Sequence, residues 1–337
     1  EAHRGRVAEY RAEALILATG ARERHLPFKG WTLPGVISTG AAQILMKGSG
    51  ILPGVNPLIA GCTPLMLVLA AEILANGGGV RAVLDQSTAA QKLTLFSAGT
   101  AIWPRLFEGA LHLARLVAAR VPIQQAVRVV EARGGQSLET VVAARVDASG
   151  RVCRGTETLY QADTLTVGQG FAPNIELPLQ AGCRIAYGMD KGGWYVAVTD
   201  AMETSLAGIY AVGETTGIAG GGKSYIEGRM AAWDILHKQD RADPQTCVCR
   251  IRTLTRMRNR QVRYGRFLNR LCHPPAGAYA DIPDEVIVCR CEAISMGEIR
   301  RHLAQDVATM NGIKKATRCG MGFCQGRTCG PIPVSYK

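Results

Sequence analysis

Five of the eleven cysteines of this chain lie close together near its end, and they are the residues best suited to metal chemistry. They form a C-x-C pair and a C-x4-C pair with one further cysteine between them: Cys289, Cys291, Cys319, Cys324 and Cys329. Tight pairs of thiolates predict a metal centre sooner than disulfides in a chain of this length. Iron–sulfur and zinc chemistry both remain open at this point, although C-x4-C is not the usual zinc-ribbon spacing.

The remaining cysteines do not form a second pattern of this kind. Cys62, Cys153, Cys183 and Cys272 are scattered, which is typical of small apolar core residues. The pair at 247 and 249 copies the C-x-C spacing but has no second pair nearby. A metal site is therefore predicted only for the cluster at 289–329.

Elements must bring the two pairs together. Residues 295–304 are predicted to form a helix that begins at Ser295, since Glu298 three residues later completes a capping box. Glycines at 320, 322 and 326 let the backbone wrap around a metal centre and turn amide groups toward sulfur.

Two apolar segments run directly into glycine turns, at residues 14–20 (ALILATG) and 208–214 (GIYAVGE). Apolar runs without alternation predict strands buried on both faces of a parallel sheet. Residues 163–170 (DTLTVGQG) repeat the pattern. These strands and the helix expected at 225–237 indicate an α/β fold.

A βαβ unit is predicted between residues 57 and 85, with strands at 58–61 and 80–85 and a helix at 64–76. Such units hold nucleotides at the turn after the first strand. Here only Gly61 remains of the usual glycine fingerprint, and Thr63 adds a side chain where backbone should meet a pyrophosphate. Asp85 ends the second strand and is a candidate ribose ligand. A pyridine nucleotide is therefore doubtful, and another nucleotide or none is favoured.

The net charge of +12 is concentrated in one stretch. Eight arginines lie between positions 250 and 270, interleaved with apolar residues at roughly helical spacing. An amphipathic connecting helix with a solvated basic face is favoured. The alternative is a docking surface for an acidic partner or an anionic membrane, and nucleic acid is third because no recognised binding motif accompanies the charge.

No apolar run reaches the length of a membrane helix, and no signal peptide is recognised. We expect a cytoplasmic protein, with peripheral association at the inner membrane as a possibility.

The cysteine segments resemble a known domain. VCRCE at 288–292 and TRCGMGFCQGRTC at 317–329 are similar to the bacterioferritin-associated-ferredoxin (BFD) type of [2Fe-2S] domain, in the form fused to flavoprotein dehydrogenases. In relatives such as the large subunit of anaerobic glycerol-3-phosphate dehydrogenase, the position of Cys319 is not a cysteine. The resemblance thus implies a [2Fe-2S] cluster held by four of the five: Cys289, Cys291, Cys324 and Cys329.

The two glycine turns resemble the ATG and G-x-Y-A-x-G-D segments of flavoproteins with two dinucleotide-binding domains. Both segments approach FAD in that family, with Glu214 here in place of the commoner Asp. The resemblance implies that FAD is bound by Ala18, Thr19, Gly20, Gly213 and Glu214. It also makes the inserted βαβ unit, with Gly61 and Asp85, the NAD(P) site of relatives.

The implied fold is an FAD/NAD(P)-binding Rossmann-like flavoprotein followed by a small helical [2Fe-2S] domain. We predict an FAD-binding domain at 1–54 and 161–238, an inserted NAD(P)-binding-like domain at 55–160, a basic linker at 239–282 and the BFD-like domain at 283–337. The opening strand and glycine loop of the family are not found before Ala14, and the chain starts at Glu1. We therefore expect the native protein to begin upstream, and to continue as a helix beyond Lys337.

Residues 22–36 (RERHLPFKGWTLPGV), with these features, narrow the resemblance to the FAD-containing subunits of hydrogen cyanide synthase, opine oxidase and proline or hydroxyproline dehydrogenases. It implies an electron-transferring subunit of an enzyme that oxidises the CH–NH bonds of amino acids or imino- and opine-type amines. The implied partner is an amino-acid-oxidase-like FAD subunit. The implied acceptor is a quinone, a ferredoxin-like subunit or a dye. No residue is predicted as a general base.

Other classes of protein remain as alternatives. One is a non-catalytic scaffold in which a zinc knuckle replaces the cluster, and another is a nucleic-acid or membrane-surface binder that uses the arginine-rich stretch. A disulfide reductase would need a redox-active cysteine pair beside the flavin, and Cys62, Cys153 and Cys183 are single in the sequence.

Overall fold

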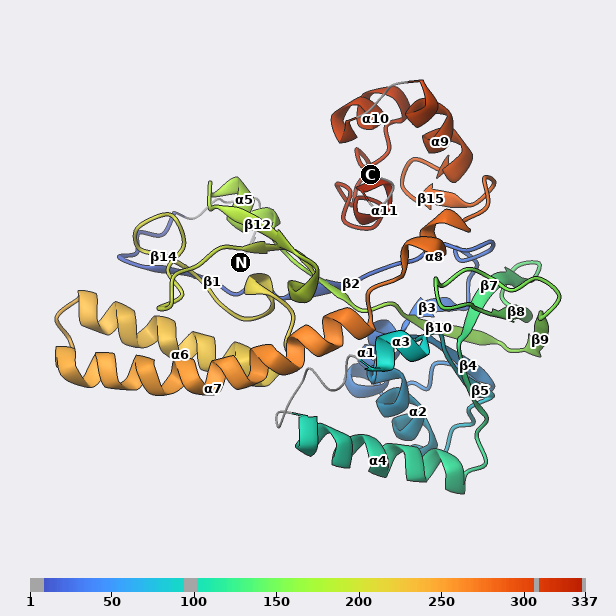
Figure 1. Cartoon of the computed structure of the whole chain (residues 1–337), viewed down its shortest axis with the longest axis horizontal. Helices are drawn as coiled ribbons and strands as arrows, with labels where there is room; N and C mark the ends of the chain where they lie inside the picture. The colour runs from blue at the N-terminus through green and yellow to red at the C-terminus, as the bar shows by residue number, and fades with distance from the viewer. Residues whose placement is uncertain (1–8, 94–101, 306–308, 335–337) are drawn as a thin grey trace. The chain divides into compact units, whose positions relative to one another are not determined.

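The computed structural model describes residues 9–93, 102–305 and 309–334. They form two compact units, one made of residues 1–22 and 172–269 and the other of residues 23–171 and 270–337. The chain thus enters each unit twice, as the colours in Figure 1 show. Each unit is built from segments that are far apart in the sequence.

The first unit is centred on two parallel strands, β1 (Leu15–Leu17) and β14 (Ile209–Ala211). Around them lie α5 (Glu176–Gln180), the hairpin of β12 (Ile185–Gly188) and β13 (Gly193–Val196), and the short 3-10 helices η2 (Met189–Lys191) and η3 (Gly213–Thr216). Two long helices complete the unit, α6 (Gly221–Lys238) and α7 (Pro244–Leu271).

Helices α6 and α7 run side by side (Figure 1) because both bury apolar residues in one core. Ile226 and Met230 lie one helical turn apart on α6 and pack with Leu254 of α7 and Tyr210 of β14. α6 extends the helix predicted at 225–237, and α7 confirms that the arginine-rich stretch is helical.

The second unit contains a five-stranded parallel sheet in the order β3 (Val36–Ser38), β10 (Thr164–Gly168), β4 (Pro57–Gly61), β5 (Ala82–Asp85) and β6 (Ile123–Gln125). Its helices are α1 (Thr39–Ser49), α2 (Leu65–Ala75), α3 (Ala89–Leu93) and α4 (Trp103–Ala118). An antiparallel sheet of β7 (Val127–Arg133), β8 (Thr140–Arg145) and β9 (Thr158–Gln161) follows. The short strands β2 (Ala21–Glu23) and β11 (Phe171–Pro173) pair where the chain passes between units.

The predicted βαβ unit is confirmed as β4, α2 and β5. All five residues of β4 are buried, as expected for a strand covered on both faces. Since β4 lies between β5 and β10, the direction of winding reverses between β4 and β10, where α/β sheets form their ligand crevice.

The cysteine-rich segment follows α8 (Ala276–Ala280) and belongs to this second unit. It contains β15 (Ile287–Cys289), β16 (Ile294–Ser295), α9 (Met296–Ala304), α10 (Met310–Thr317) and α11 (Pro331–Val334). The predicted capping box is present: Ser295 accepts from the Glu298 backbone, and the Glu298 carboxylate accepts from the Ser295 backbone. Trp31 Nε1 donates to the Ile287 carbonyl at 2.7 Å and ties the segment to the rest of its unit.

The compact units are larger than the predicted domains and do not test the predicted boundaries. Residues 23–54, expected in the FAD-binding domain, lie in the same unit as residues 55–160. Most of the predicted linker is α7, which belongs to the first unit up to residue 269. The division into four domains stays a prediction.

Candidate functional site

Three cysteine sulfurs of the second unit converge in its interior. Cys289 ends β15, Cys319 follows α10 and Cys329 precedes α11, and their Sγ atoms lie within 4.8 Å of one another. All three residues are buried. Such a group of thiols is suited to a soft metal centre, because each can supply a thiolate without moving far.

The chain turns Cys319 toward this group through a local device. α10 ends in Thr317, and Arg318 then adopts a left-handed conformation with φ of 64°. The Thr317 hydroxyl donates to the Ile313 carbonyl and accepts from the Cys319 backbone N–H at 3.1 Å. These contacts reverse the chain and fix the backbone from which the Cys319 thiol projects.

The other two cysteines lie on the solvent side of the same site. Cys291 is exposed and Cys324 is half-buried, and their side chains are hydrogen-bonded to each other. Gly322 packs against Cys291 so closely that a Cβ at this position would overlap the Cβ of Cys291. Gly320 and Gly326 have positive φ. The glycines predicted to let the backbone wrap the site are therefore required by its geometry.

The acidity of the thiols differs across the site. Burial opposes the charged form of Cys324, but hydrogen bonds from Thr328 and Cys291 outweigh it and lower the pKa of Cys324. The pKa of Cys329 is raised, because its sulfur is hydrogen-bonded with Cys319 and is buried. Cys324 is thus ready to ligate as a thiolate, whereas Cys329 needs a cation to displace its proton.

The donor set fits a [2Fe-2S] cluster, which needs four convergent thiolates. The predicted ligands fall into two pairs, Cys289 with Cys329 and Cys291 with Cys324. Cys319, predicted to lie outside the ligand set, is beside the first pair. The choice of four ligands among the five cysteines stays a prediction. Sequence spacing did not place Cys319 in the site, although its position directly after a helix end was a usable signal.

The two glycine turns predicted to contact FAD lie side by side in the first unit. Leu17 pairs with Ala211, so the parallel strands β1 and β14 end together and deliver both turns to one edge. Gly20 and Gly213 adopt φ of 69° and 79°, which favour glycine. Ala18 is exposed, and Thr19 is half-buried.

Asn174 connects these two turns and was missed by the sequence analysis. Its carbonyl accepts from the hydroxyls of Thr19 and Thr215, at 2.7 and 2.8 Å. Its side chain donates to the Thr19 carbonyl. The signal in the sequence was Pro173-Asn174, directly after the glycine turn of the third predicted strand.

A network of buried charges stands behind the second turn. Lys223 donates to the carbonyls of Gly213 and Gly217 and to the Thr216 hydroxyl, and pairs with Glu227 at 3.0 Å. Burial lowers the pKa of Lys223, and Glu227 opposes this shift. Arg258 of α7 pairs with the other carboxylate oxygen of Glu227 at 2.7 Å. The turn is thus held from below by compensated charges.

Glu214 points back to the chain. Its carboxylate accepts hydrogen bonds from the backbone N–H groups of Ala219 and Gly220, just before α6. Burial raises the pKa of Glu214 in spite of Lys223. The predicted hydrogen bond from Glu214 to a ribityl hydroxyl stays a prediction, and it would have to compete with these two amides.

The first unit nevertheless fits a flavin cofactor in its backbone. A Cβ added at Gly20, Gly220 or Gly221 would meet no described atom within 4 Å. The glycines therefore leave backbone accessible beside the amino end of α6, where amide N–H groups favour a phosphate or a carbonyl of the flavin.

The residues predicted for a nucleotide in the second unit are engaged elsewhere. Gly61 has φ of 145° and lies against the Gly168 carbonyl, so a side chain would overlap β10. Asp85 accepts from the Ser87 backbone at 2.8 Å and pairs with Lys92 at 2.8 Å. Strand packing and an ion pair explain these two residues without a ligand.

The crevice beside these residues is filled by the chain itself. The Cys272 thiol donates to the Cys62 carbonyl at 3.2 Å, and the Cys62 thiol donates to the Cys272 carbonyl at 3.5 Å. The Gln91 side chain donates to the carbonyls of Leu271 and His273. Cys62, which the sequence analysis treated as single, therefore has Cys272 as a neighbour, and the premise on which the disulfide-reductase alternative was set aside is wrong for this residue.

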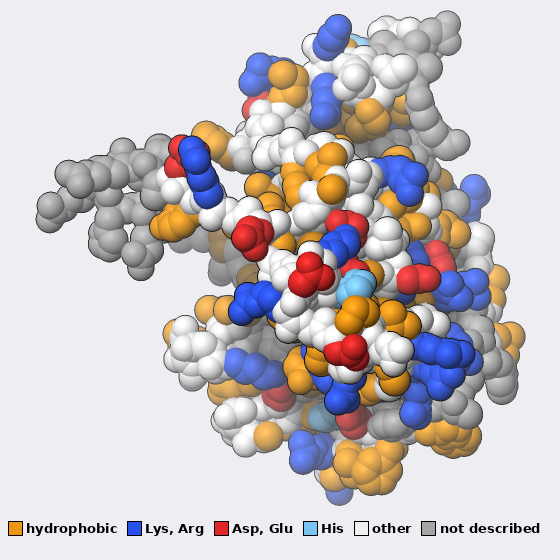
Figure 2. All heavy atoms as spheres, turned by 90° about the vertical axis from the view of Figure 1, so that its left-hand side faces the viewer, with side chains coloured by type: hydrophobic (Ala, Val, Ile, Leu, Met, Phe, Trp, Pro, Cys, Tyr) orange, Lys and Arg blue, Asp and Glu red, His pale blue; other side chains and the backbone are white. Residues whose placement is uncertain are grey.

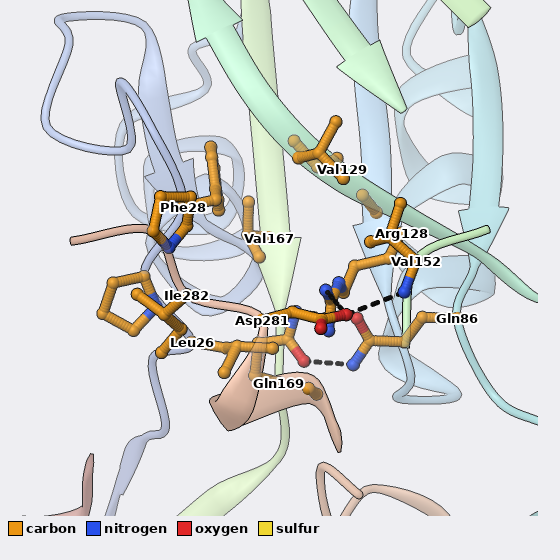
Figure 3. A pocket seen from close by; sticks show the side chains of 15 residues that line it. Leu26, Phe28, Gln86, Arg128, Val129, Val152, Val167, Gln169, Asp281 and Ile282 are labelled. Carbon is orange, nitrogen blue, oxygen red and sulfur yellow. Dashed lines mark hydrogen bonds and ion pairs between the residues drawn. The ribbon is translucent and has the colours of Figure 1, made fainter. Parts of the chain in front are cut away.

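What space remains is small (Figure 3). A cavity of about 70 Å³ lies between the sheet and α8, and its polar side chains point toward each other. Arg128 pairs with Asp281 at 3.2 Å, and Gln86 is hydrogen-bonded to Gln169. The cavity has room for a few waters at about 30 Å³ each, whereas small-molecule sites need at least about 300 Å³. The residues present do not fit a pyridine nucleotide.

The basic helix α7 has a solvated face, as predicted. Most of its arginines are exposed: Arg250, Arg252, Arg256, Arg260, Arg263, Arg266 and Arg270. Arg266 pairs with Asp190 at 3.2 Å. On the face shown in Figure 2, basic side chains alternate with acidic and apolar ones. Among the described residues, no helix has the length and apolar character to cross a membrane.

Comparisons with known proteins agree with this geometry. Residues 1–237 match the profile of the pyridine nucleotide-disulphide oxidoreductase family, and residues 287–332 match that of the BFD-like [2Fe-2S] binding domain. The chain is similar to one of the subunits of opine oxidase from Rhizobium meliloti, with 32% identity over 94% of this chain and 59% of the relative. It is also similar to hydrogen cyanide synthase subunit HcnB of Pseudomonas aeruginosa, with 34% identity over 98% of this chain and 70% of the relative.

Among solved structures, L-proline dehydrogenase from P. horikoshii has a similar fold. The TM-score is 0.60 at 19% identity, and the match covers 96% of this chain and 52% of that chain. The chain spans about 60% of the length of the opine oxidase relatives, at 59% and 61% for two of them.

Proposed function

The chain belongs to the pyridine nucleotide-disulphide oxidoreductase family and carries a BFD-like [2Fe-2S] binding domain, and on this basis we propose that it is the FAD- and iron–sulfur-carrying subunit of a multi-subunit dehydrogenase or oxidase. Its substrates are proposed to be amino acids or imino- and opine-type amines, oxidised at a CH–NH bond. The names of the relatives support this reading, since those compared are subunits of opine oxidase and hydrogen cyanide synthase.

The observation that carries the proposal is the convergence of buried cysteines inside the segment that matches the iron–sulfur profile. FAD exchanges electrons in pairs or singly and a [2Fe-2S] cluster exchanges them singly, so a chain that binds both can convert between the two modes. We propose Cys289, Cys291, Cys324 and Cys329 as cluster ligands, and Ala18, Thr19, Gly20, Gly213 and Glu214 as flavin contacts.

The side chains of this polypeptide supply position rather than acid–base chemistry. Asn174 holds the two glycine turns together, and the pair of Lys223 and Glu227 keeps the second turn at the amino end of α6. The glycines of the cysteine segment allow close approach of backbone amides to sulfur, which adjusts a reduction potential. No described residue is proposed as a general base.

Partners follow from this division of labour. We propose that a separate amino-acid-oxidase-like FAD subunit removes the electrons from the substrate, and that a quinone, a ferredoxin-like subunit or a dye receives them. Association with an anionic membrane surface through α7 is a weaker part of the proposal, supported by its exposed arginines. NAD(P) is left out, because its crevice is filled by residues 271–282.

The test is the iron, zinc and acid-labile sulfide content of the protein, with an electron paramagnetic resonance spectrum after reduction. The proposal predicts about two irons per cluster, hence per chain, and a rhombic signal that Cys324→Ser abolishes. Cys319→Ser is the matched control and should retain iron and signal. Stoichiometric zinc without a signal would instead establish a structural knuckle, and loss of the cluster only in Cys319→Ser would refute the proposed ligand set.

A further inference from the structure

The loop that carries Cys324 exposes two large apolar side chains. Phe323 has an exposed fraction of 99% and Met321 of 47%. They flank Gly322, so both project from one short stretch of chain. An aromatic ring that is almost completely exposed gains nothing from the fold, and exposed apolar groups that cluster in this way indicate an interaction site.

This pair lies over the solvent side of the cysteine site. Gly322, between them, packs against the Cys291 side chain. Cys291 is exposed and is hydrogen-bonded to Cys324, which directly follows Phe323. The three other cysteines are buried. Met321 and Phe323 therefore mark the place where the sulfur site comes nearest to solvent.

Basic side chains surround the same place. Arg290, Lys315, Arg318 and Arg327 are exposed and come from the two segments that form the site. The carboxylate of Glu292 is paired with Arg318 at 2.8 Å, so the acidic group nearest to Gly322 is already compensated. Arg290 stacks over the Trp31 ring with its charged group 5.2 Å from the ring centre, and remains exposed. The rim is thus positively charged.

We propose that Met321, Phe323 and the basic side chains of Arg290, Lys315, Arg318 and Arg327 form the docking surface for a one-electron carrier protein with an acidic rim and an apolar centre. The inference rests on the proposed [2Fe-2S] cluster. One electron leaves the reduced cluster and enters the oxidised centre of the carrier, so that the cluster is oxidised and the carrier is reduced by one electron each. The carrier docks where Cys291 and Cys324 reach the surface.

A protein partner accounts for both features of the surface. Aromatic side chains at the centre of an interface carry much of its affinity, while charges at the rim increase the rate of encounter with a partner of opposite sign. A small acceptor would need neither a fully exposed ring nor a charged rim. An anionic membrane shares the charge preference, so the experiment includes it as a competing outcome.

The experiment measures electron transfer from the dithionite-reduced protein, loaded with its cluster, by stopped-flow absorbance. The acidic soluble domain of cytochrome b5 and the basic cytochrome c serve as protein probes, and benzoquinone serves as a small neutral acceptor. We expect a larger second-order rate with cytochrome b5, decreasing steeply with salt, because the Debye length falls to about 3 Å at 1 M.

Variants locate the surface. Phe323→Ala and Arg318→Glu should each lower the rate with cytochrome b5 about tenfold at low salt, which corresponds to the loss of one strong interface contact. The rate with benzoquinone and the paramagnetic signal should not change. Phe107→Ala removes another exposed aromatic ring of the same unit, 68% exposed on α4, and should keep the full rate.

Each outcome decides. Equal or faster transfer to cytochrome c, or variants that transfer to cytochrome b5 as fast as the parent, would overturn the docking surface. Binding to phosphatidylserine vesicles that is lost in Phe323→Ala, without a loss of transfer to cytochrome b5, would assign the surface to a membrane and overturn it as well. A parent protein without iron or paramagnetic signal refutes the proposed function instead, and the two failures are thereby distinguished.

Discussion

The two proposed cofactor regions differ in how their buried polar groups are satisfied. Around Gly213, Lys223 has three oxygen acceptors as well as Glu227, and Glu227 is also paired with Arg258. Around Cys289, the buried thiols have one another as neighbours, and the pKa of Cys329 is raised by its contact with Cys319. The flavin region is held by charges of its own, whereas the cysteine region is completed by a cation.

This difference has a physical consequence for folding. Compensated ion pairs stabilise only when both partners are present, since an unpaired buried charge is costly. A thiol site gains its binding energy from the metal, and that energy becomes folding energy. The first region should therefore respond most to substitution, and the second to removal of iron.

The largest expected effect breaks the charge network of the first unit. Lys223→Met leaves Glu227 buried with Arg258 alone and should reduce the free energy of unfolding by about 3–5 kcal/mol, as for other broken buried pairs. Urea unfolding measures it. The matched control is Lys238→Met, which removes a largely exposed pair with Glu203 and should cost less than about 1 kcal/mol. If both variants lose the same stability, the contrast between the two regions is wrong.

A smaller effect tests the segment that fills the crevice. Burial, and secondly the charge of Arg24, lower the pKa of His273 from 6.5 to about 4. A lowered histidine pKa favours the neutral form in the folded state, so its contribution is present above pH 6.5 and lost as the pH falls toward 4. A shift of this size is worth about 3 kcal/mol, or about 2 kcal/mol after allowing for partial exposure.

His273→Asn should flatten the pH dependence of the free energy of unfolding between pH 7 and pH 4, measured by urea titration at several pH values. At pH 8 the parent and the variant should differ only by packing. An unchanged slope in acid would show that the segment is solvated and does not fill the crevice.

The smallest effect concerns the cysteine region. Ser295→Ala removes the capping box of α9 and should cost about 1 kcal/mol. We expect faster release of iron to a chelator, followed by absorbance, with no change in flavin content. Thr309→Ala, which removes the side-chain cap of α10, should act in the same direction. Release at the parent rate in both would mean that α9 and α10 do not control the cysteine site.

Much of the local structure could be read directly from the sequence. β4, α2 and β5, the capping box at Ser295 and the helix through the arginine-rich stretch are found as predicted. So are the paired ends of β1 and β14, which bring Gly20 and Gly213 to one edge. The family was recognised from short segments such as residues 317–329, because their residue types are set by chemistry rather than by fold.

Other features were decided only by the tertiary structure. Cys319 joins Cys289, Cys272 closes the crevice at Cys62, and Asn174 links two turns. Each contact joins residues far apart in the chain, so no local pattern of polarity or spacing encodes it. Periodicity, caps and glycine turns act over a few residues, and the sequence alone determined these. Which buried side chains then meet depends on how strands and helices pack, because burial is a property of the assembled core.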